Sequence, residues 1–218
     1  MNRILSRLFL LFPTIRIIYH LVFLRPKNIL NITNFYLSGD KILSNFYKSF
    51  VDSSANKTIS LDIGCGSNPQ NPFEASKVIG VDLFENSQKE IKKCMLGFEA
   101  LPYETNSIDY ISAFDLIEHI PRVHFQDGKI STPFIFLMNE IWRVLKNNGI
   151  LLSFTPIIPF HGAHQDPTHV NLIVYGTYEK YFSNKKLQIA SEYGVKANFN
   201  ILDEKLYNEH LVSILKKS

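Results

Sequence analysis

The sequence is poor in cysteine and has no long uninterrupted apolar run. Only Cys65 and Cys94 occur among 218 residues, so no disulfide framework is expected, and a reducing, cytoplasmic setting is the simpler prediction. Residues 4–24 are rich in Leu, Ile and Phe but are interrupted by two arginines and a proline, whereas a membrane-spanning helix needs about 20 consecutive apolar residues. The run at residues 8–12 is short and no small-residue cleavage site follows it. We therefore expect neither a transmembrane helix nor a secretory signal.

Acidic residues are absent before Asp40, whereas five of the 23 basic residues lie there. The remaining 18 basic residues are outnumbered by the 20 acidic ones. Because a nucleic-acid interface needs clustered Lys and Arg, we predict no nucleic-acid partner. Residues 1–39 are interpreted as a basic, apolar extension of a domain at residues 40–218. Residues 1–27 either lie at the inner face of an anionic membrane or form an ordinary packed helix, and both interpretations stay open.

Short β-rich runs alternate with helical patterns from residue 58 onward, which is typical of a parallel sheet with helices on both faces. The expected strands are residues 58–63, 78–83, 108–114 and 150–154, followed by a closing pair at 195–201 and 211–215. The expected helices are residues 41–51, 133–146, where Gly149 is interpreted as a helix stop, and one or two short ones within 178–194. The fold class is therefore predicted to be α/β.

A glycine pair follows the first strand, in the segment LDIGCGSNP at residues 61–69. Gly64 and Gly66 allow a tight turn and a close approach of the backbone to a ligand. The next strand, VIGVDLF at residues 78–84, ends near Asp82, where a carboxylate can accept hydrogen bonds from both hydroxyls of a ribose. Pro69 occupies the position of the third glycine of a dinucleotide fingerprint, and the Asp62 carboxylate suits a cationic ligand better than a pyrophosphate.

Four blocks in this order resemble the class I methyltransferases that use S-adenosylmethionine. They are LDIGCG, VIGVD, LPYETNSIDYISAFDLIEHI and EIWRVLKNNGILLSFTP, and together they cover roughly residues 58–157. The resemblance implies a Rossmann-like, seven-stranded, mostly parallel sheet and S-adenosylmethionine as cofactor. It implies that Asp62, Gly64 and Gly66 contact the methionine part, Asp82 the ribose and Phe98 the adenine. The full predicted set of cofactor-binding residues is Asp62, Gly64, Cys65, Gly66, Asp82, Leu83, Phe98 and Asp115.

Two departures from the family pattern accompany this resemblance. Gly97 stands where an acidic residue often precedes the adenine contact, and Pro69 and Pro72 shorten the helix after the glycine loop. A shortened helix is similar to the pattern in methyltransferases of bacterial surface-polysaccharide clusters.

Candidate bases for methyl transfer should follow the strands at their carboxyl ends. Asp115, Glu118 and His119 follow the strand at residues 108–114, and the Asn/Asp-Pro-Pro-aromatic motif of nucleic-acid amino-methyltransferases is absent there. His119 is interpreted either as a general base or as a residue that only hydrogen-bonds locally.

The loop PFHGAHQDPTHVN at residues 159–171 gathers three of the seven histidines. Its polar side chains either bind acceptor hydroxyls and supply a base, hold a divalent metal ion, or only stabilise their own turn. The spacing fits no zinc signature, so no metal site is predicted and a divalent metal remains the minority alternative. The D-P-T-H run resembles sugar and lipopolysaccharide methyltransferases. The predicted catalytic residues are His119, His164, Asp166 and His169.

The resulting hypothesis is an S-adenosylmethionine-dependent methyltransferase that O-methylates a sugar in surface-polysaccharide biosynthesis. Two alternatives stay open: a methyltransferase for a small lipid-like or quinone acceptor, and a cofactor-binding scaffold without catalysis. The sequence does not determine the oligomeric state.

Overall fold

The computed structural model describes residues 40–51, 57–183 and 187–218. The predicted extension at residues 1–39, with its proposed membrane contact at residues 1–27, lies outside the described residues. Within the described part, no helix has both the length and the apolar character that a membrane span requires.

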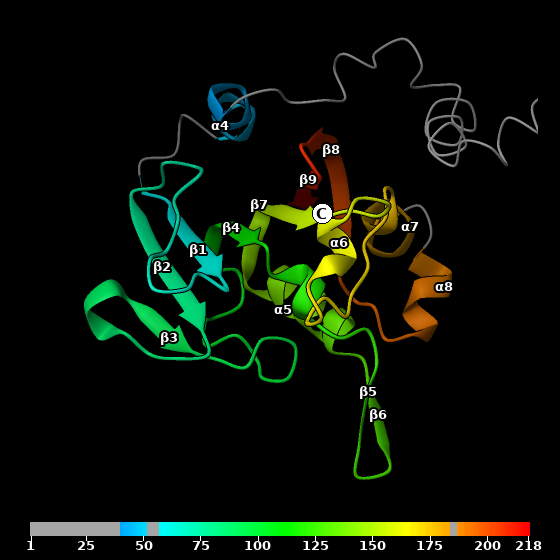
Figure 1. Ribbon diagram of the computed structural model, residues 1–218. Helices are drawn as coiled ribbons and strands as arrows, with labels where there is room; N and C mark the ends of the chain where they lie inside the picture. The colour runs from blue at the N-terminus through cyan, green and yellow to red at the C-terminus, as the bar shows by residue number, and fades with distance from the viewer. Residues whose placement is uncertain (1–39, 52–56, 184–186) are drawn as a thin grey trace, which may run out of the picture. The chain divides into compact units, whose positions relative to one another are not determined.

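Seven strands form one sheet in the order β3-β2-β1-β4-β7-β9-β8 (Figure 1). Strands β3, β2, β1, β4 and β7 run parallel, whereas β9 is antiparallel to both β7 and β8. The strands are β1 (Ile59–Ile63), β2 (Lys77–Asp82), β3 (Ile91–Lys93), β4 (Ile108–Phe114), β7 (Leu145–Pro156), β8 (Phe199–Tyr207) and β9 (His210–Lys217). The predicted seven-stranded, mostly parallel, Rossmann-like sheet is confirmed.

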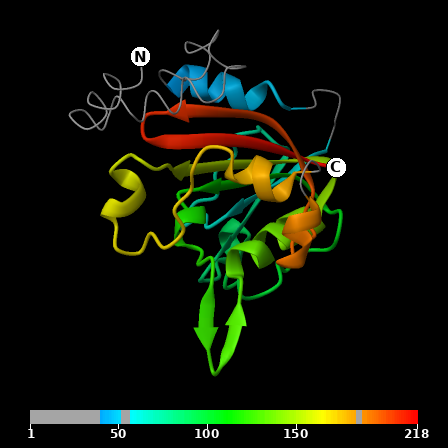
Figure 2. The same cartoon turned by 90° about the vertical axis from the view of Figure 1, so that its right-hand side faces the viewer.

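A separate two-stranded hairpin, β5 (His124–Gln126) and β6 (Lys129–Ser131), projects from the domain before α5 (Figure 2). The helices are α4 (Asp40–Lys48), η2 (Ser87–Lys89), η3 (Ile117–His119), α5 (Pro133–Val144), α6 (Gly162–Gln165), α7 (Thr177–Phe182) and α8 (Leu187–Glu192). The helices expected near residues 41–51, 133–146 and 178–194 are all present.

Alternate residues of the central strand β7 face two different helical layers. Leu152, on one face, belongs to a core cluster that includes Tyr47 of α4. Ser153, on the other face, hydrogen-bonds through its hydroxyl with Tyr178 of α7 at 2.7 Å. Since side chains alternate across a strand, α4 and α7 cover opposite faces of the sheet, as Figure 2 shows.

On the face of the sheet that α4 covers, an aromatic side chain packs where a helix was expected. Residues 64–76, between β1 and β2, form turns and contain no helix, so even the shortened helix predicted after the glycine loop is absent. Phe73 from this segment is fully buried and stacks on Tyr110 of β4, with ring centroids 4.7 Å apart. α4 and Phe73 together replace the missing helix as cover for this face.

The junction between α5 and β7 differs from the prediction. α5 ends at Val144 and β7 begins at Leu145, so Gly149 lies within the strand and its interpretation as a helix stop is wrong. A Cβ atom at Gly149 would lie 2.9 Å from the Lys146 carbonyl oxygen and 3.1 Å from that of Asp109. The glycine is therefore explained by close backbone packing.

Strand β8 begins at Phe199 and ends at Tyr207, later than predicted. The preceding residues are held by α5: the Asn139 side chain accepts hydrogen bonds from the backbone N–H groups of Lys196 and Ala197, at 2.8 and 2.9 Å. Because these backbone groups bind a helix side chain, they do not join the sheet.

Gly80 in β2 lies directly beneath the glycine loop. A Cβ atom there would lie 2.5 Å from Cys65 Sγ and 2.8 Å from Pro69 Cγ. The Gly80→Ala variant is expected to lose about 1–3 kcal/mol of unfolding free energy in urea titration, the usual cost of overpacking. The Cys65→Ala/Gly80→Ala double variant should regain part of that loss, because it removes the nearer atom. A Gly80→Ala protein as stable as the parent would contradict this packing.

Candidate functional site

The glycine loop after β1 is fixed by backbone geometry and by Asp82. Gly64 and Gly66 have φ angles of +68° and +56°, a region that glycine occupies without strain. The Gly64 N–H donates to the Val81 carbonyl at 2.8 Å, and the Gly66 N–H donates to Asp82 Oδ2 at 2.8 Å. A Cβ atom at Gly66 would meet no heavy atom of the described residues within 4 Å. The loop therefore presents open space next to the Asp82 carboxylate.

Asp62 is buried beneath this loop, with 1% of its surface exposed. One carboxylate oxygen accepts from Ser112 Oγ at 2.7 Å and the other from the Gln70 N–H at 2.8 Å. Burial raises the pKa of Asp62 to about 6, although both hydrogen bonds oppose that rise. The carboxylate is therefore ionised at neutral pH and places a negative charge below the loop, which suits a cationic ligand.

Exposed apolar side chains follow the carboxyl ends of β2 and β3. Leu83 is 65% exposed, Met95 50% and Phe98 40%, and the Leu83 N–H donates to Asp82 Oδ1 at 2.7 Å. Neighbouring exposed apolar groups often mark a ligand surface. Their place beside Asp82 is suitable for a flat, weakly polar ring such as adenine.

Gly97 has a structural reason to depart from the family pattern. Its φ angle is +86°, and a Cβ atom there would lie 3.0 Å from Ile120 Cγ2 and 3.1 Å from Pro133 Cβ. An acidic side chain would be strained at this backbone conformation and would have no room. The turn before Phe98 therefore excludes the residue type expected from the family.

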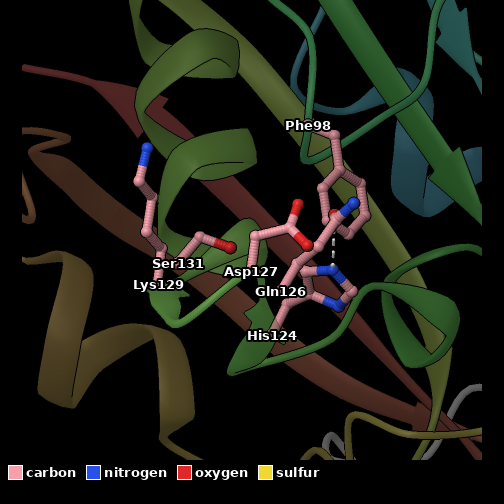
Figure 3. A pocket seen from close by; sticks show the side chains of 6 residues that line it. All are labelled: Phe98, His124, Gln126, Asp127, Lys129 and Ser131. Carbon is pink, nitrogen blue, oxygen red and sulfur yellow. Dashed lines mark hydrogen bonds between the residues drawn. The ribbon is translucent and has the colours of Figure 1, made fainter.

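A pocket of about 340 Å³ borders Phe98 (Figure 3). It is lined by Phe98, His124, Gln126, Asp127, Lys129 and Ser131, so most of it comes from the β5–β6 hairpin. The Phe98 and His124 rings meet edge to face with centroids 5.1 Å apart. This contribution of the hairpin could not be predicted from the sequence, because the hairpin carries no recognisable motif.

Cys65 lies in the loop as a thiol. Burial raises its pKa to about 11, so the thiolate is scarce at neutral pH and the side chain is a poor nucleophile. The side chain instead fills space against Gly80.

Asp115 and His210 form a pair that no pattern in the sequence indicates. Asp115 directly follows β4 with a φ angle of +46°, and its Oδ1 lies 2.9 Å from His210 Nε2. His210 begins β9, which is antiparallel to β7, so the start of β9 meets the carboxyl end of β7. The His210 ring stacks on Phe154, with centroids 4.4 Å apart. Only the strand register could have indicated this meeting.

The histidine-rich loop folds onto the turn that follows β4. The backbone N–H groups of Val170 and Asn171 both donate to the Glu118 carbonyl at 2.9 Å. The Asn171 side chain donates to the Ile117 carbonyl at 3.0 Å and accepts from Arg122 Nε at 2.7 Å. The loop at residues 159–171 and the turn after β4, which are separate in the sequence, are therefore held together by hydrogen bonds.

Three of the four predicted catalytic residues lie together. The Thr168 hydroxyl lies 2.7 Å from Asp166 Oδ1 and 3.0 Å from His119 Nδ1. The His119 and His169 rings meet edge to face with centroids 4.7 Å apart. His164 is exposed on α6, and its ring lies 6.2 Å from that of His161. No contact among the described residues joins His164 to the other three.

Glu118 also belongs to this group. It is 1% exposed, and its Oε2 accepts from Thr155 Oγ1 at 2.7 Å. Burial raises the pKa of Glu118, and the nearby Asp115 carboxylate contributes to that rise. Glu118, Asp115 and the histidines therefore lie close enough to interact electrostatically.

Comparison with known proteins concerns the domain and its fold. A family model described as "Methyltransferase domain" matches residues 61–153. No curated protein matches the sequence.

Solved structures are similar at low identity. A SAM-dependent methyltransferase from Archaeoglobus fulgidus is 14% identical, covers 83% of this chain and 95% of its own, and gives a TM-score of 0.50. The PH0226 protein from Pyrococcus horikoshii OT3 is 14% identical, covers 89% and 100%, and also gives 0.50. This chain spans 58% of the length of the cyclase SpnF, which is 18% identical over 75% of this chain with a TM-score of 0.46.

At these identities the structural likeness shows the fold, and the family match shows the domain. The site agrees with both, since the glycine loop, the Asp82 carboxylate and the buried Asp62 lie within the matched segment. Residues 61–153 therefore form a methyltransferase domain, and the sheet that contains them has the fold of S-adenosylmethionine-dependent methyltransferases.

Proposed function

We propose that this methyltransferase transfers the methyl group of S-adenosylmethionine to a hydroxyl of a saccharide, in surface-polysaccharide biosynthesis. The observation that carries the proposal is the set of acid–base and hydrogen-bonding side chains around the turn after β4, a turn whose Leu116 packs against Gly64 of the glycine loop. They are Asp115, Glu118, His119, Asp166, His169 and His210. A sugar presents several hydroxyls at once, and such a surface offers both donors and acceptors for them.

Methyl transfer to a hydroxyl requires a base. The new bond joins the acceptor oxygen to the methyl carbon, the carbon–sulfur bond breaks, and the hydroxyl proton goes to the protein. We assign that base to His210, because its Nε2 lies 2.9 Å from Asp115 Oδ1 and a carboxylate orients an imidazole. The predicted His119, Asp166 and His169 would then bind the acceptor.

A lipid-like or quinone acceptor is the second candidate, and one observation favours it. The β5–β6 hairpin and the residue before it carry exposed apolar side chains. The exposed fraction is 49% for Val123, 72% for Phe125 and 68% for Ile130. These apolar side chains are suitable for an acceptor anchored in a membrane. Five of the six residues that line the pocket carry hydrogen-bonding side chains, which favours the saccharide.

Removing the Asp82 carboxylate should weaken cofactor binding. In the Asp82→Ala variant the ribose hydroxyls would lose their acceptor and the Gly66 N–H would lose its partner. We expect calorimetric titration with S-adenosylhomocysteine to show affinity at least about tenfold lower, ~1.4 kcal/mol. Glu85→Ala is the matched control, because it removes an exposed carboxylate three residues away. If both variants lost the same affinity, the loss would be explained by the change in net charge and not by a contact of Asp82 with the ribose.

Cofactor binding should depend on pH through Asp62. Its pKa of about 6 lies above the ordinary 3.8, so the carboxylate is neutral at pH 5 and ionised at pH 7.5. The affinity for S-adenosylmethionine, relative to S-adenosylhomocysteine, should therefore rise about tenfold between these values and stay level above, as expected for one opposite charge nearby. The two ligands share the amino-acid group, so the ratio isolates the sulfonium charge.

Asp62→Asn provides the control for this pH dependence, since it removes the titrating group. The ratio of the two affinities should then be flat from pH 5 to 7.5. A ratio that still rises in Asp62→Asn would assign the titration to another residue.

Methyl transfer itself tests the acceptor and the base. Labelled S-adenosylmethionine would be incubated with nucleotide sugars, short oligosaccharides and a hydroxylated quinone precursor. We expect label on a saccharide, and His210→Asn should lower kcat by about 100-fold while leaving S-adenosylhomocysteine affinity within about twofold. Glu209→Gln is the control and should leave kcat close to the parent value. It changes the residue next to His210 but keeps a side-chain oxygen that can accept from the Gly162 N–H.

The other outcomes separate the alternatives. Label on the quinone precursor alone would replace the saccharide with the second candidate. Cofactor binding without transfer to any acceptor would support a non-catalytic scaffold. Unchanged kcat in His210→Asn would overturn the assignment of the base.

A further inference from the structure

Three potential metal ligands converge from two segments that are distant in sequence. Glu118 and His119 come from η3, and His169 comes from the loop after β7. One ligating atom from each side chain lies within 4.8 Å of the other two. The sequence could not show this, because the spacing between the η3 pair and His169 matches no metal signature.

Two buried polar atoms in this group have no hydrogen-bond partner among the described residues. They are Oε1 of Glu118 and Nδ1 of His169. Buried polar groups in folded proteins are nearly always satisfied, so each exception indicates a missing ion, ligand or water. Two such atoms fall in this three-residue cluster, whereas Tyr47 Oη and Ser60 Oγ are single cases elsewhere in the described residues.

The surrounding hydrogen bonds hold the cluster in a form suitable for binding a cation. Thr155 Oγ1 donates to Glu118 Oε2, which fixes that carboxylate and leaves Oε1 available. The Thr168 hydroxyl has a single proton, which it donates to Asp166 at 2.7 Å, so it accepts from His119 Nδ1 at 3.0 Å. That arrangement leaves the lone pair of His119 on Nε2. Metal-binding histidines are commonly oriented by such a bond from their second nitrogen.

We propose that Glu118, His119 and His169 bind one divalent transition-metal ion. Two imidazole nitrogens and one carboxylate oxygen are ligands that Zn²⁺, Co²⁺ and Mn²⁺ accept. Three protein ligands leave coordination positions free, and a pair of neighbouring acceptor hydroxyls would fit them. The binding of the ion is independent of the proposed function, whereas this role toward a sugar diol rests on it.

Metal binding can be measured without any acceptor. Protein stripped with a chelator would be titrated with Zn²⁺ by calorimetry and with Co²⁺ by visible absorption. We expect one ion per chain in the parent, and at least about tenfold weaker binding in His169→Ala and in Glu118→Gln. His161→Ala is the matched control, because it removes an exposed histidine from the same loop and should bind as the parent does.

The affinity for S-adenosylhomocysteine provides the folding check for each variant. If His169→Ala fails this check, Glu118→Gln and His119→Asn provide the same test of the cluster. Full metal affinity in folded cluster variants, or equal loss in His161→Ala, would place the ion elsewhere and overturn the proposal. Absence of binding in the parent would also overturn it. If the ion binds but no saccharide is methylated, the proposed function fails and the metal site stands.

Discussion

The buried carboxylate of Asp62 is the constraint on which the cofactor site depends. It binds Ser112 of β4 and the backbone of Gln70, so one side chain holds the glycine loop to two strands. Its pKa, raised from 3.8 to about 6, costs stability. As pH rises from about 4 to about 6, Asp62 ionises in the unfolded chain before it ionises in the folded one. The free energy of unfolding therefore falls by about 3 kcal/mol and does not recover above pH 6. The proposed site for a cationic cofactor would explain why a buried charge is retained at this cost.

Periodicity predicted the parallel core because each of its strands is a short apolar run between turns. Periodicity did not predict the elements whose structure depends on tertiary contacts. β3 has three residues, of which only Ile91 is buried, and so small a pattern gives no signal. Residues 195–198 have strand-like composition, but Asn139 and Trp142 of α5 bind their backbone. The absence of a helix at residues 64–76 was only partly indicated by the prolines, because the packing of Phe73 replaces it.

The two halves of the site differed in how far the sequence could predict them. The cofactor half depends on the glycine loop and Asp82, which are close in sequence and fall in recognisable motifs. The proposed acceptor half is assembled from separate segments, so the sequence showed its polar residues but not which of them meet. His164 and His169 share one loop, yet α6 ends at Gln165 and the chain turns at Asp166. That turn brings only His169 to His119.

The short turn after β4 contacts both halves of the site. On one side Leu116 packs so closely against Gly64 that a Cβ atom there would lie 2.7 Å from Leu116 Cδ1. On the other side the Glu118 carbonyl receives the two N–H groups of the histidine loop. Asp115, between β4 and Leu116, binds His210. An in-line displacement requires donor and acceptor to be aligned within a fraction of an ångström. Because one turn contacts the glycine loop, the proposed base and the histidine cluster, their relative positions are set by the fold itself.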